Sequence, residues 1–214
     1  RVLRGGECDA AIAGGVNVIL QPYLHAAAAK AGLLSPGGRC RAFDKDADGY
    51  VRGEGVGAVF LKSLKQAEAD GDFIYAVIRE SAVNHGGRSA SLTAPNPRRQ
   101  ADLLVEAYGR AGIDPATITC VETHGTGTRL GDPIEINGLK QAFAELYKRW
   151  GKDAPRRPHC ALGSVKANIG HLETAAGVAS VIKTILAMRH GILPGNIHLS
   201  EQNPLIDLEG TPFY

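Results

Sequence analysis

The chain has 214 residues, of which 24 are Lys or Arg and 22 are Asp or Glu, so its formal net charge is only +2. This near-neutral balance excludes a long basic surface for nucleic acid, because phosphate binding needs clustered excess cations. With 44% hydrophobic and 21% charged residues, the sequence has enough apolar material for a core and differs clearly from a disordered chain.

Two further features concern the compartment. The longest uncharged stretch, residues 10–29, has the length of a membrane span, but its glycines, Asn17, Gln21 and Pro22 make it a poor membrane helix. The four cysteines, at positions 8, 40, 120 and 160, show neither metal-ligand spacing nor the density of a disulfide framework. We therefore expect a cytoplasmic protein with free thiols, no bound metal and no membrane or nucleic-acid partner.

Apolar runs beside glycines alternate with helical patterns along the chain. The predicted strands lie, in order, at residues 10–20, 57–64, 73–84, 118–122 and 160–165. The predicted helices lie at residues 22–31, 98–111, 133–147 and 171–190. The last helix has the clearest helical spacing of apolar residues, and Gly191 provides its stop. Such alternation favours an α/β fold in which helices cover sheets.

Residues 44–54, DKDADGYVRGE, match the first half of a calcium-binding EF-hand loop. Asp44, Asp46 and Asp48 fall at ligand positions 1, 3 and 5 of such a loop. The bidentate Glu belongs at position 12, which Gly55 occupies, and the preceding sequence predicts a turn instead of a helix. We therefore interpret the segment as a tight acidic loop without a calcium ion.

The strongest local signal is the peptide VETHGTGTRLGD at residues 121–132. A predicted strand leads into His124 and a Gly/Thr turn, and a helix begins near Asp132. Loops at the ends of rigid strands often carry functional side chains, so His124 is a candidate catalytic residue. Thr126 and Thr128 offer hydroxyls beside amides that glycine leaves uncovered. A turn in which the histidine only hydrogen-bonds locally would give the same pattern.

The peptide GSVKANIGHLE at residues 163–173 repeats this arrangement. A short predicted strand leads to Lys166, and the next helix is predicted to begin at His171. The positive end of a helix and the nearby lysine both disfavour a second cation, so we expect His171 to be neutral. A neutral imidazole can donate an N–H to a developing oxyanion. The structural alternative is an N-terminal capping cluster with a surface lysine.

None of the cysteines has the positive, partly exposed setting that a nucleophile needs. Cys8 lies between two acidic residues, which disfavour the thiolate, and Cys120 and Cys160 lie in predicted strands and are expected to be buried. Cys40 lies between two arginines, but in a turn without a histidine near in sequence.

Taken together, the chain resembles the β-ketoacyl synthase family, and specifically the ketosynthase domains of modular type I polyketide synthases. The matching segments are CDAAIAGGVN at 8–17, FDKDADGYVRGEGVG at 43–57, ETHGTGTRLGDPIE at 122–135, GSVKANIGHLE at 163–173, LPGN at 193–196 and NPLIDLEGTPFY at 203–214. The likeness runs nearly from end to end. VNHGGR at 83–88, with LTAPNP at 92–97, is most similar to ketosynthases of trans-acyltransferase assembly lines.

The resemblance implies a thiolase-like α/β fold, a layered α-β-α-β-α sandwich that is usually a homodimer. Residues 1–214 would then be a ketosynthase fragment, incomplete at both ends, with the end of the N-terminal half and most of the C-terminal half. The implied reaction is decarboxylative Claisen condensation between an acyl chain and a malonyl-type extender. Both are presented on the 4′-phosphopantetheine of acyl carrier proteins, with no cofactor bound directly, and neighbouring polyketide synthase domains are further implied partners.

The family's site residues are matched position by position. His124 and His171 match catalytic histidines that donate hydrogen bonds to the extender's thioester oxygen. Lys166 matches the family's active-site lysine, which orients the neighbouring groups and sets the local electrostatic field. Asp132 matches a supporting residue expected to pair with the lysine network. The substrate-binding positions implied by the match are Thr126, Thr128 and Asn168.

The family's nucleophilic cysteine lies in a Thr-Ala-Cys-Ser-Ser-Ser peptide that these 214 residues do not contain. Family spacing places that peptide shortly before Arg1, and Cys8 matches a non-catalytic position. We therefore expect condensation by the parent protein and an inactive fragment. The alternatives are a non-condensing module that docks acyl carrier proteins, and a decarboxylating relative with another residue in place of the cysteine.

Overall fold

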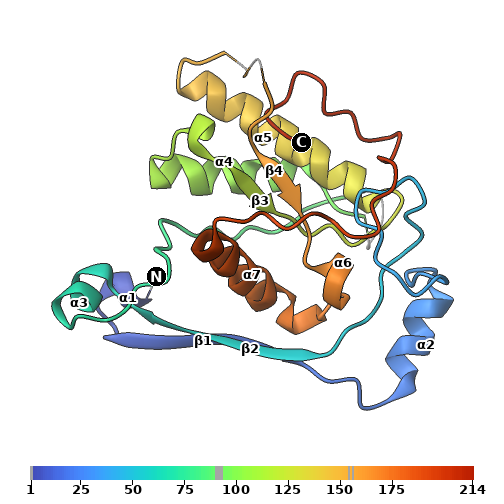
Figure 1. Cartoon of the computed structure of the whole chain (residues 1–214), viewed down its shortest axis with the longest axis horizontal. Helices are drawn as coiled ribbons and strands as arrows, with labels where there is room; N and C mark the ends of the chain where they lie inside the picture. The colour runs from blue at the N-terminus through green and yellow to red at the C-terminus, as the bar shows by residue number, and fades with distance from the viewer. Residues whose placement is uncertain (1, 90–93, 154, 156) are drawn as a thin grey trace.

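The computed structural model describes residues 2–89, 94–153, 155 and 157–214, and these form a mixed α/β structure (Figure 1). Its elements, in chain order, are α1 (Val2–Gly5), β1 (Ala10–Asn17), α2 (Pro22–Lys30), β2 (Gly55–Lys62), α3 (Leu64–Ala69), α4 (Pro97–Ala111), η1 (Pro115–Thr117), β3 (Cys120–Glu122), α5 (Gly131–Arg149), β4 (Ala161–Gly163), α6 (Lys166–Ile169), η2 (Glu173–Ala175) and α7 (Ala176–His190). The predicted α/β class is confirmed. Residues 92 and 93 of the LTAPNP motif lie outside the described residues.

The strands form two small sheets. β1 and β2 pair antiparallel along all 8 residues of each strand and make a long ribbon, while β3 and β4 pair in parallel. Gly15 allows β1 to approach η2 closely, because a Cβ at this position would lie 2.5 Å from the Thr174 carbonyl oxygen. The ribbon is therefore fitted directly onto the segment that leads into α7.

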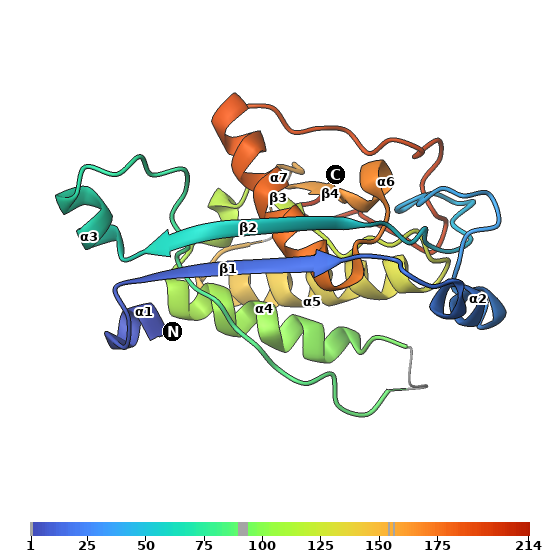
Figure 2. The same cartoon turned by 90° about the horizontal axis from the view of Figure 1, so that it is seen from below.

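The elements lie in successive layers (Figures 1 and 2). The β1–β2 ribbon is followed by α7, then by the β3–β4 sheet, and then by α4 and α5 on the far side. Alternating sheet and helix layers agree with part of the predicted five-layer sandwich. The complete sandwich stays a prediction.

The hydrophobic core lies where α4 and α5 cover the β3–β4 sheet. Along α5, Ile136, Leu139, Phe143 and Leu146 recur every three or four residues, and each is at most 3% exposed. The ring of Phe143 packs edge-on against Phe213, with 4.8 Å between ring centroids. The end of the chain thus closes one side of the core.

The outer face of the β1–β2 ribbon is apolar and exposed. Ile12 lies opposite Phe60, and Val16 lies opposite Val56, so the four side chains share one face. Their exposed fractions are 76%, 67%, 56% and 81%, respectively. The ribbon also packs against η2 and α7.

The predicted strand at residues 73–84 is wrong, because this segment has no regular secondary structure. A strand needs a neighbour that binds its N–H and C=O groups, and no other strand among the described residues pairs with this one. Its large apolar side chains are exposed, including Phe73 (72%) and Val83 (86%). Phe73 and Tyr75 instead flank the guanidinium of Arg189 on α7, at 5.7 and 5.0 Å from the ring centroids.

The other predicted strands correspond to β1, β2, β3 and β4, and the first three predicted helices to α2, α4 and α5, with small differences at the ends. The start predicted for the last helix, at His171, is wrong, because α7 begins at Ala176. Gly170 (φ 76°) and Glu173 (φ 46°) have left-handed backbones that interrupt a right-handed helix.

The acidic loop at residues 44–54 has a structural role through Asp44. The buried carboxylate accepts hydrogen bonds from the N–H groups of Asp46 (2.8 Å), Ser200 (2.6 Å) and Glu201 (3.1 Å), and from the Ser200 hydroxyl. Burial alone would raise the pKa of Asp44, but these donors lower it to about 2. Asp44 thus ties the loop to the chain 156 residues further on.

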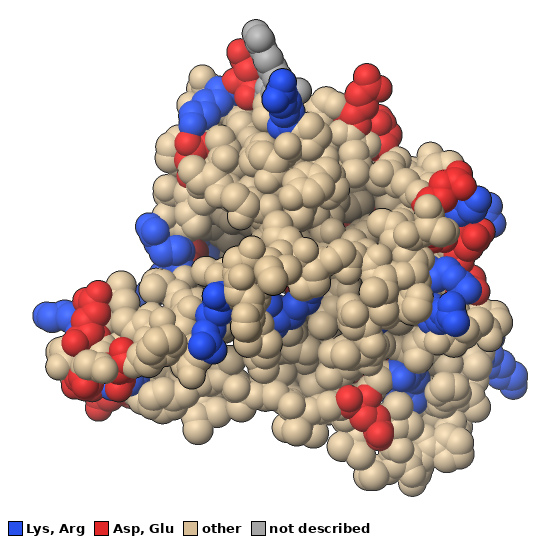
Figure 3. Space-filling model, in the orientation of Figure 1, with Lys and Arg blue, Asp and Glu red and all other residues tan. Residues whose placement is uncertain are grey.

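Charges of both signs are interspersed over the face in Figure 3, and no single-sign patch covers it. Within the described part of the chain, no helix has the length and apolar character needed to span a bilayer.

Candidate active site

Two histidine-bearing loops meet where the β3–β4 sheet ends. In the parallel register, Glu122 at the end of β3 lies beside Gly163 at the end of β4, so the segments that follow leave the sheet at the same edge. One segment carries His124 and the other His171. Their imidazole rings lie 5.2 Å apart, centroid to centroid, and are nearly perpendicular at 84°. The two histidines predicted from separate motifs are therefore neighbours.

Lys166 is the buried cation beside this pair. It is the first residue of α6 and is 2% exposed. Burial lowers the pKa of its ammonium, and the charges of Glu135 and Glu122 act in the opposite direction. Among the described residues, no carboxylate forms a direct ion pair with Lys166, so the expected pairing with Asp132 is only a longer-range attraction.

The surroundings favour the neutral form of both imidazoles. Part of His124 reaches solvent, but the surrounding protein desolvates its ring, and this burial together with the charges of Lys166 and His171 lowers its pKa to about 4. Burial and Lys166 also lower the pKa of His171. The expected neutrality of His171 agrees with this direction. The positive end of a helix does not contribute to this neutrality as expected, because α7 begins at Ala176 and not at His171.

The tautomer of His171 follows from its backbone contacts. The N–H of Glu173 donates to His171 Nδ1 at 2.9 Å, so Nδ1 carries a lone pair and the proton of the neutral ring is on Nε2. The ring also lies 5.3 Å from that of Tyr50, centroid to centroid. His171 is thus a donor through Nε2.

Two acids near the start of α5, Asp132 and Glu135, hold the loop that contains His124. Glu135 accepts the N–H groups of His124 (2.7 Å) and Gly125 (2.8 Å). Asp132 accepts the N–H groups of Gly127 (3.2 Å) and Phe43 (2.8 Å). Burial raises the pKa of both carboxyls, and these donors oppose the shift.

Glu135 is a site residue that the sequence reasoning did not single out. The available signal was an acid near the start of a helix that directly follows a glycine-rich loop. At this position, a carboxylate can bind loop N–H groups that have no other partner.

The substrate-binding candidates do not all lie together. Thr126 is buried, Thr128 is half-buried, and their hydroxyl oxygens lie 3.3 Å apart. Gly127, between them, has φ 77° and lets the loop pass close to residues 40 and 41. Asn168 lies on α6 with an exposed side chain and has no side-chain hydrogen bond to another described residue.

All four cysteines are free thiols. Cys40 is buried near Lys166 and accepts the N–H of Val51 at 3.1 Å; burial raises its pKa despite that bond and the lysine's charge. Cys160 is buried as expected, whereas Cys120 is only half-buried. Burial likewise raises the pKa of Cys120, and that of Cys160 to about 12. These shifts agree with the prediction that none of the three is an activated nucleophile.

Two models of one protein family match this chain. The model of the family described as "Beta-ketoacyl synthase, C-terminal domain" matches residues 75–200, and that described as "Beta-ketoacyl synthase, N-terminal domain" matches residues 1–67. The chain belongs to the β-ketoacyl synthase family.

More particularly, it is part of a polyketide synthase ketosynthase domain, as the resemblance predicted. It is 56% identical over 212 residues to polyketide synthase PksN of Bacillus subtilis. The matched region is 99% of this chain and 4% of PksN. It is 52% identical to polyketide synthase ThaG of Burkholderia thailandensis, over 96% of this chain and 4% of ThaG.

Solved ketosynthases agree in fold. The ketosynthase from module 6 of the Bacillus subtilis bacillaene synthase matches with a TM-score of 0.94 and 44% identity, over 100% of this chain and 37% of that one. An oxazolomycin ketosynthase domain of Streptomyces albus matches with a TM-score of 0.93 and 48% identity, over 100% of this chain and 36% of that one. The chain therefore spans little more than a third of these ketosynthases, and the match confirms the resemblance to ketosynthases of the trans-acyltransferase kind.

Proposed function

We propose that this chain supplies the histidine pair and lysine of a polyketide β-ketoacyl synthase that catalyses decarboxylative Claisen condensation. The observation that carries the proposal is the convergence of His124 and His171, with rings 5.2 Å apart, beside the buried Lys166. The family membership of the chain supports the same reaction.

The chemistry suits these groups. A malonyl-type thioester loses CO₂, and the electron pair of the broken C–C bond becomes an enolate whose charge lies on the thioester oxygen. The enolate carbon then attacks the acyl thioester, and the thiolate of the enzyme's cysteine leaves. Two neutral imidazole N–H donors beside that oxygen stabilise the charge, and removing such a donor typically costs about 3–4 kcal/mol of transition-state energy.

Substrates would arrive on the 4′-phosphopantetheine of acyl carrier proteins, and Thr126, Thr128 and Asn168 are the candidates for holding that arm. Neighbouring polyketide synthase domains and a homodimeric thiolase-like five-layer sandwich belong to the same proposal. Residues 1–214 would contribute the end of the N-terminal half and most of the C-terminal half. Two separate family matches, at residues 1–67 and 75–200, support this division.

The nucleophile is proposed to come from outside these residues. The Thr-Ala-Cys-Ser-Ser-Ser peptide is not in the sequence, and burial raises the pKa of Cys40, Cys120 and Cys160. For the 214 residues alone we expect no condensation and no acyl adduct. An acyl adduct on Cys8 by intact-protein mass spectrometry would contradict this.

The test uses the ketosynthase domain of the parent protein, with acyl and malonyl carrier proteins as substrates. His124→Ala and His171→Ala should each lower formation of the β-ketoacyl product by about 100-fold or more, measured by mass spectrometry of the carrier protein. His25→Ala, at an exposed position on α2, is the matched control and should keep the activity. Carrier binding without product would favour the docking alternative, and CO₂ release without product the decarboxylating one.

A further inference from the structure

An ion pair between Arg52 and Glu173 lies beside His171. Arg52 Nε donates to Glu173 Oε1 at 2.6 Å, and Arg52 Nη2 donates to Oε2 at 3.0 Å. The Arg52 side chain is 4% exposed and that of Glu173 is 30% exposed. Within the described part of the molecule, Arg52 Nη1 has no hydrogen-bond partner, so Glu173 is the group that compensates this buried charge.

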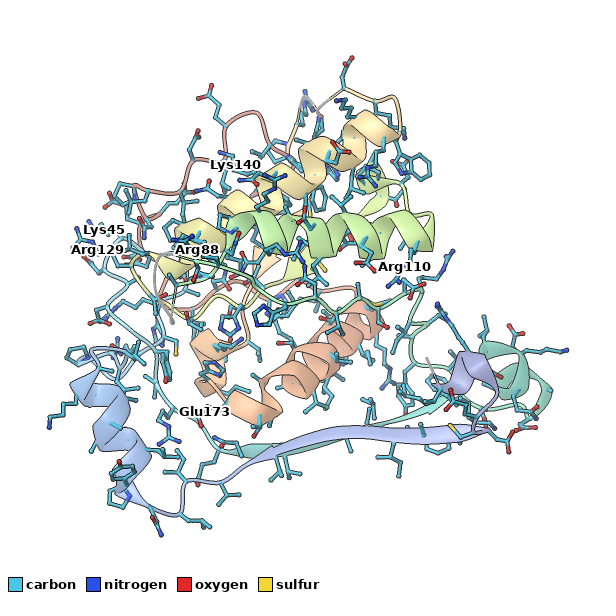
Figure 4. All side chains as sticks on the ribbon, turned by 180° about the vertical axis from the view of Figure 1, so that it is seen from behind. Lys45, Arg88, Arg110, Arg129, Lys140 and Glu173 are labelled. Atoms are coloured by element: carbon cyan, nitrogen blue, oxygen red, sulfur yellow. The ribbon has the colours of Figure 1, made fainter. Side chains whose placement is uncertain are left out.

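The backbone around Arg52 is paired with His171 on both sides. The N–H of His171 donates to the Val51 carbonyl at 2.7 Å, and the N–H of Gly53 donates to the His171 carbonyl at 2.9 Å. Arg52 thus lies alongside His171, and its side chain contacts Glu173, two residues after that histidine. Figure 4 shows Glu173 beside the start of α7.

Glu173 has a backbone conformation that an L-residue adopts at a cost. Its φ is 46°, in the left-handed region, and such a residue persists where its surroundings hold it. In this conformation its N–H is directed at His171 Nδ1, at 2.9 Å. The bidentate contact with Arg52 is the side-chain contact that fixes Glu173.

We propose that Arg52 is a positioning residue for His171, acting through Glu173. By fixing the Glu173 carboxylate, Arg52 holds the backbone N–H of Glu173 on His171 Nδ1, and so keeps the neutral ring with its proton on Nε2. A relaxed Glu173 would free Nδ1 and let the other tautomer form, which presents a lone pair where the reaction needs a donor. The catalytic meaning of this inference rests on the proposed function, but the tautomer itself does not.

The experiment reads the tautomer directly in the full 214-residue chain labelled with ¹⁵N-histidine. Long-range ¹H–¹⁵N correlation spectra distinguish a protonated from an unprotonated ring nitrogen. In the wild type we expect His171 to show an unprotonated Nδ1 and a protonated Nε2. A protonated Nδ1 of His171 in the wild type would overturn the proposal before any variant is made.

Two variants then test Arg52. Arg52→Met should give a mixture of His171 tautomers, and Arg52→Lys, which keeps the charge but loses the bidentate fork, should restore the Nε2–H form in part. Lys45→Met breaks the exposed pair between Lys45 and Glu201 and is the matched control that should leave the spectrum of His171 unchanged. A pure Nε2–H tautomer in folded Arg52→Met would refute the proposal.

Glu173 provides an independent pair should Arg52→Met not fold. Both Glu173→Gly and Glu173→Ala remove the carboxylate. Glycine adopts a positive φ without strain, whereas alanine keeps the strain. We expect Glu173→Gly to retain more of the Nε2–H form than Glu173→Ala, and equal spectra would contradict the argument. Because no substrate is used, a failure here is distinguishable from a failure of the condensation assay.

Discussion

Gly127, in the loop between the two site threonines, provides a quantitative test of the site's backbone packing. Its φ is 77°, and a Cβ at this position would lie 2.6 Å from Arg41 N, 3.1 Å from Arg41 C and 3.2 Å from Cys40 C. All three are backbone atoms, which cannot rotate away as a side chain can. The left-handed conformation costs an alanine about 1–2 kcal/mol and overpacking about 1–3 kcal/mol, so Gly127→Ala should lower the free energy of unfolding by about 2–5 kcal/mol.

Two other glycines separate the contributions. Gly112 ends α4 with φ 60° and has no atom within 4 Å of its would-be Cβ, so Gly112→Ala should cost only the conformational part, about 1–2 kcal/mol. Gly177, inside α7, has neither a positive φ nor a close neighbour, so Gly177→Ala should stabilise the chain by about 0.5–1 kcal/mol.

The assay is urea unfolding followed by circular dichroism, with m-values compared to confirm that each variant unfolds as the wild type does. The predicted order of stability is Gly177→Ala, wild type, Gly112→Ala and Gly127→Ala. If Gly127→Ala and Gly112→Ala were equally stable, the close packing of the loop against residues 40 and 41 would contribute nothing, and the reasoning would be refuted.

Three further predictions concern ionisable groups. Because hydrogen bonds lower the pKa of Asp44 to about 2, its charge should stabilise the fold by about 2 kcal/mol at pH 7, and this stabilisation should disappear as the pH falls from about 4 to 2. Urea unfolding of Asp44→Asn and wild type at several pH values measures the stabilisation, and a stability difference that does not depend on pH would contradict the prediction. The His124 ring should titrate near pH 4 by NMR and move upward in Lys166→Met, which removes a nearby positive charge; a wild-type midpoint near 6.5 would count against this. Cys160, buried with a pKa of about 12, should react with iodoacetamide far more slowly in the native than in the unfolded chain, and equal rates would disprove its burial.

The local parts of the site could be predicted from the sequence. The strand, glycine loop and helix that present His124 are consecutive in the chain, so their pattern predicts them directly, and α5 begins at Gly131, next to the expected start. The same holds for the short strand before Lys166. Family resemblance then related the two histidine loops, which no local pattern could do.

The long-range parts could not be predicted. Residues 73–84 have the apolar pattern of a strand, but a strand is defined by a neighbour, and a pattern in one segment does not reveal whether that neighbour exists. The start of α7 was misplaced because the bonds of His171 to residues 51 and 53 take it out of the helix. Arg52 and Glu173 are 121 residues apart, so nothing in the sequence indicated that they form an ion pair.

The location of the core outside the ribbon has a consequence for folding. Among the described residues, the main core cluster takes its members from α4, α5, the β3–β4 sheet and the segments packed on them, and none from β1, β2 or α7. The ribbon should therefore open as a separate cooperative unit, with faster amide hydrogen exchange than α5. His124 is held by α5, whereas His171 is bonded to the segment that leads into β2. The two histidines thus come together only when both units are closed, so partial opening of the ribbon would separate them before the core unfolds.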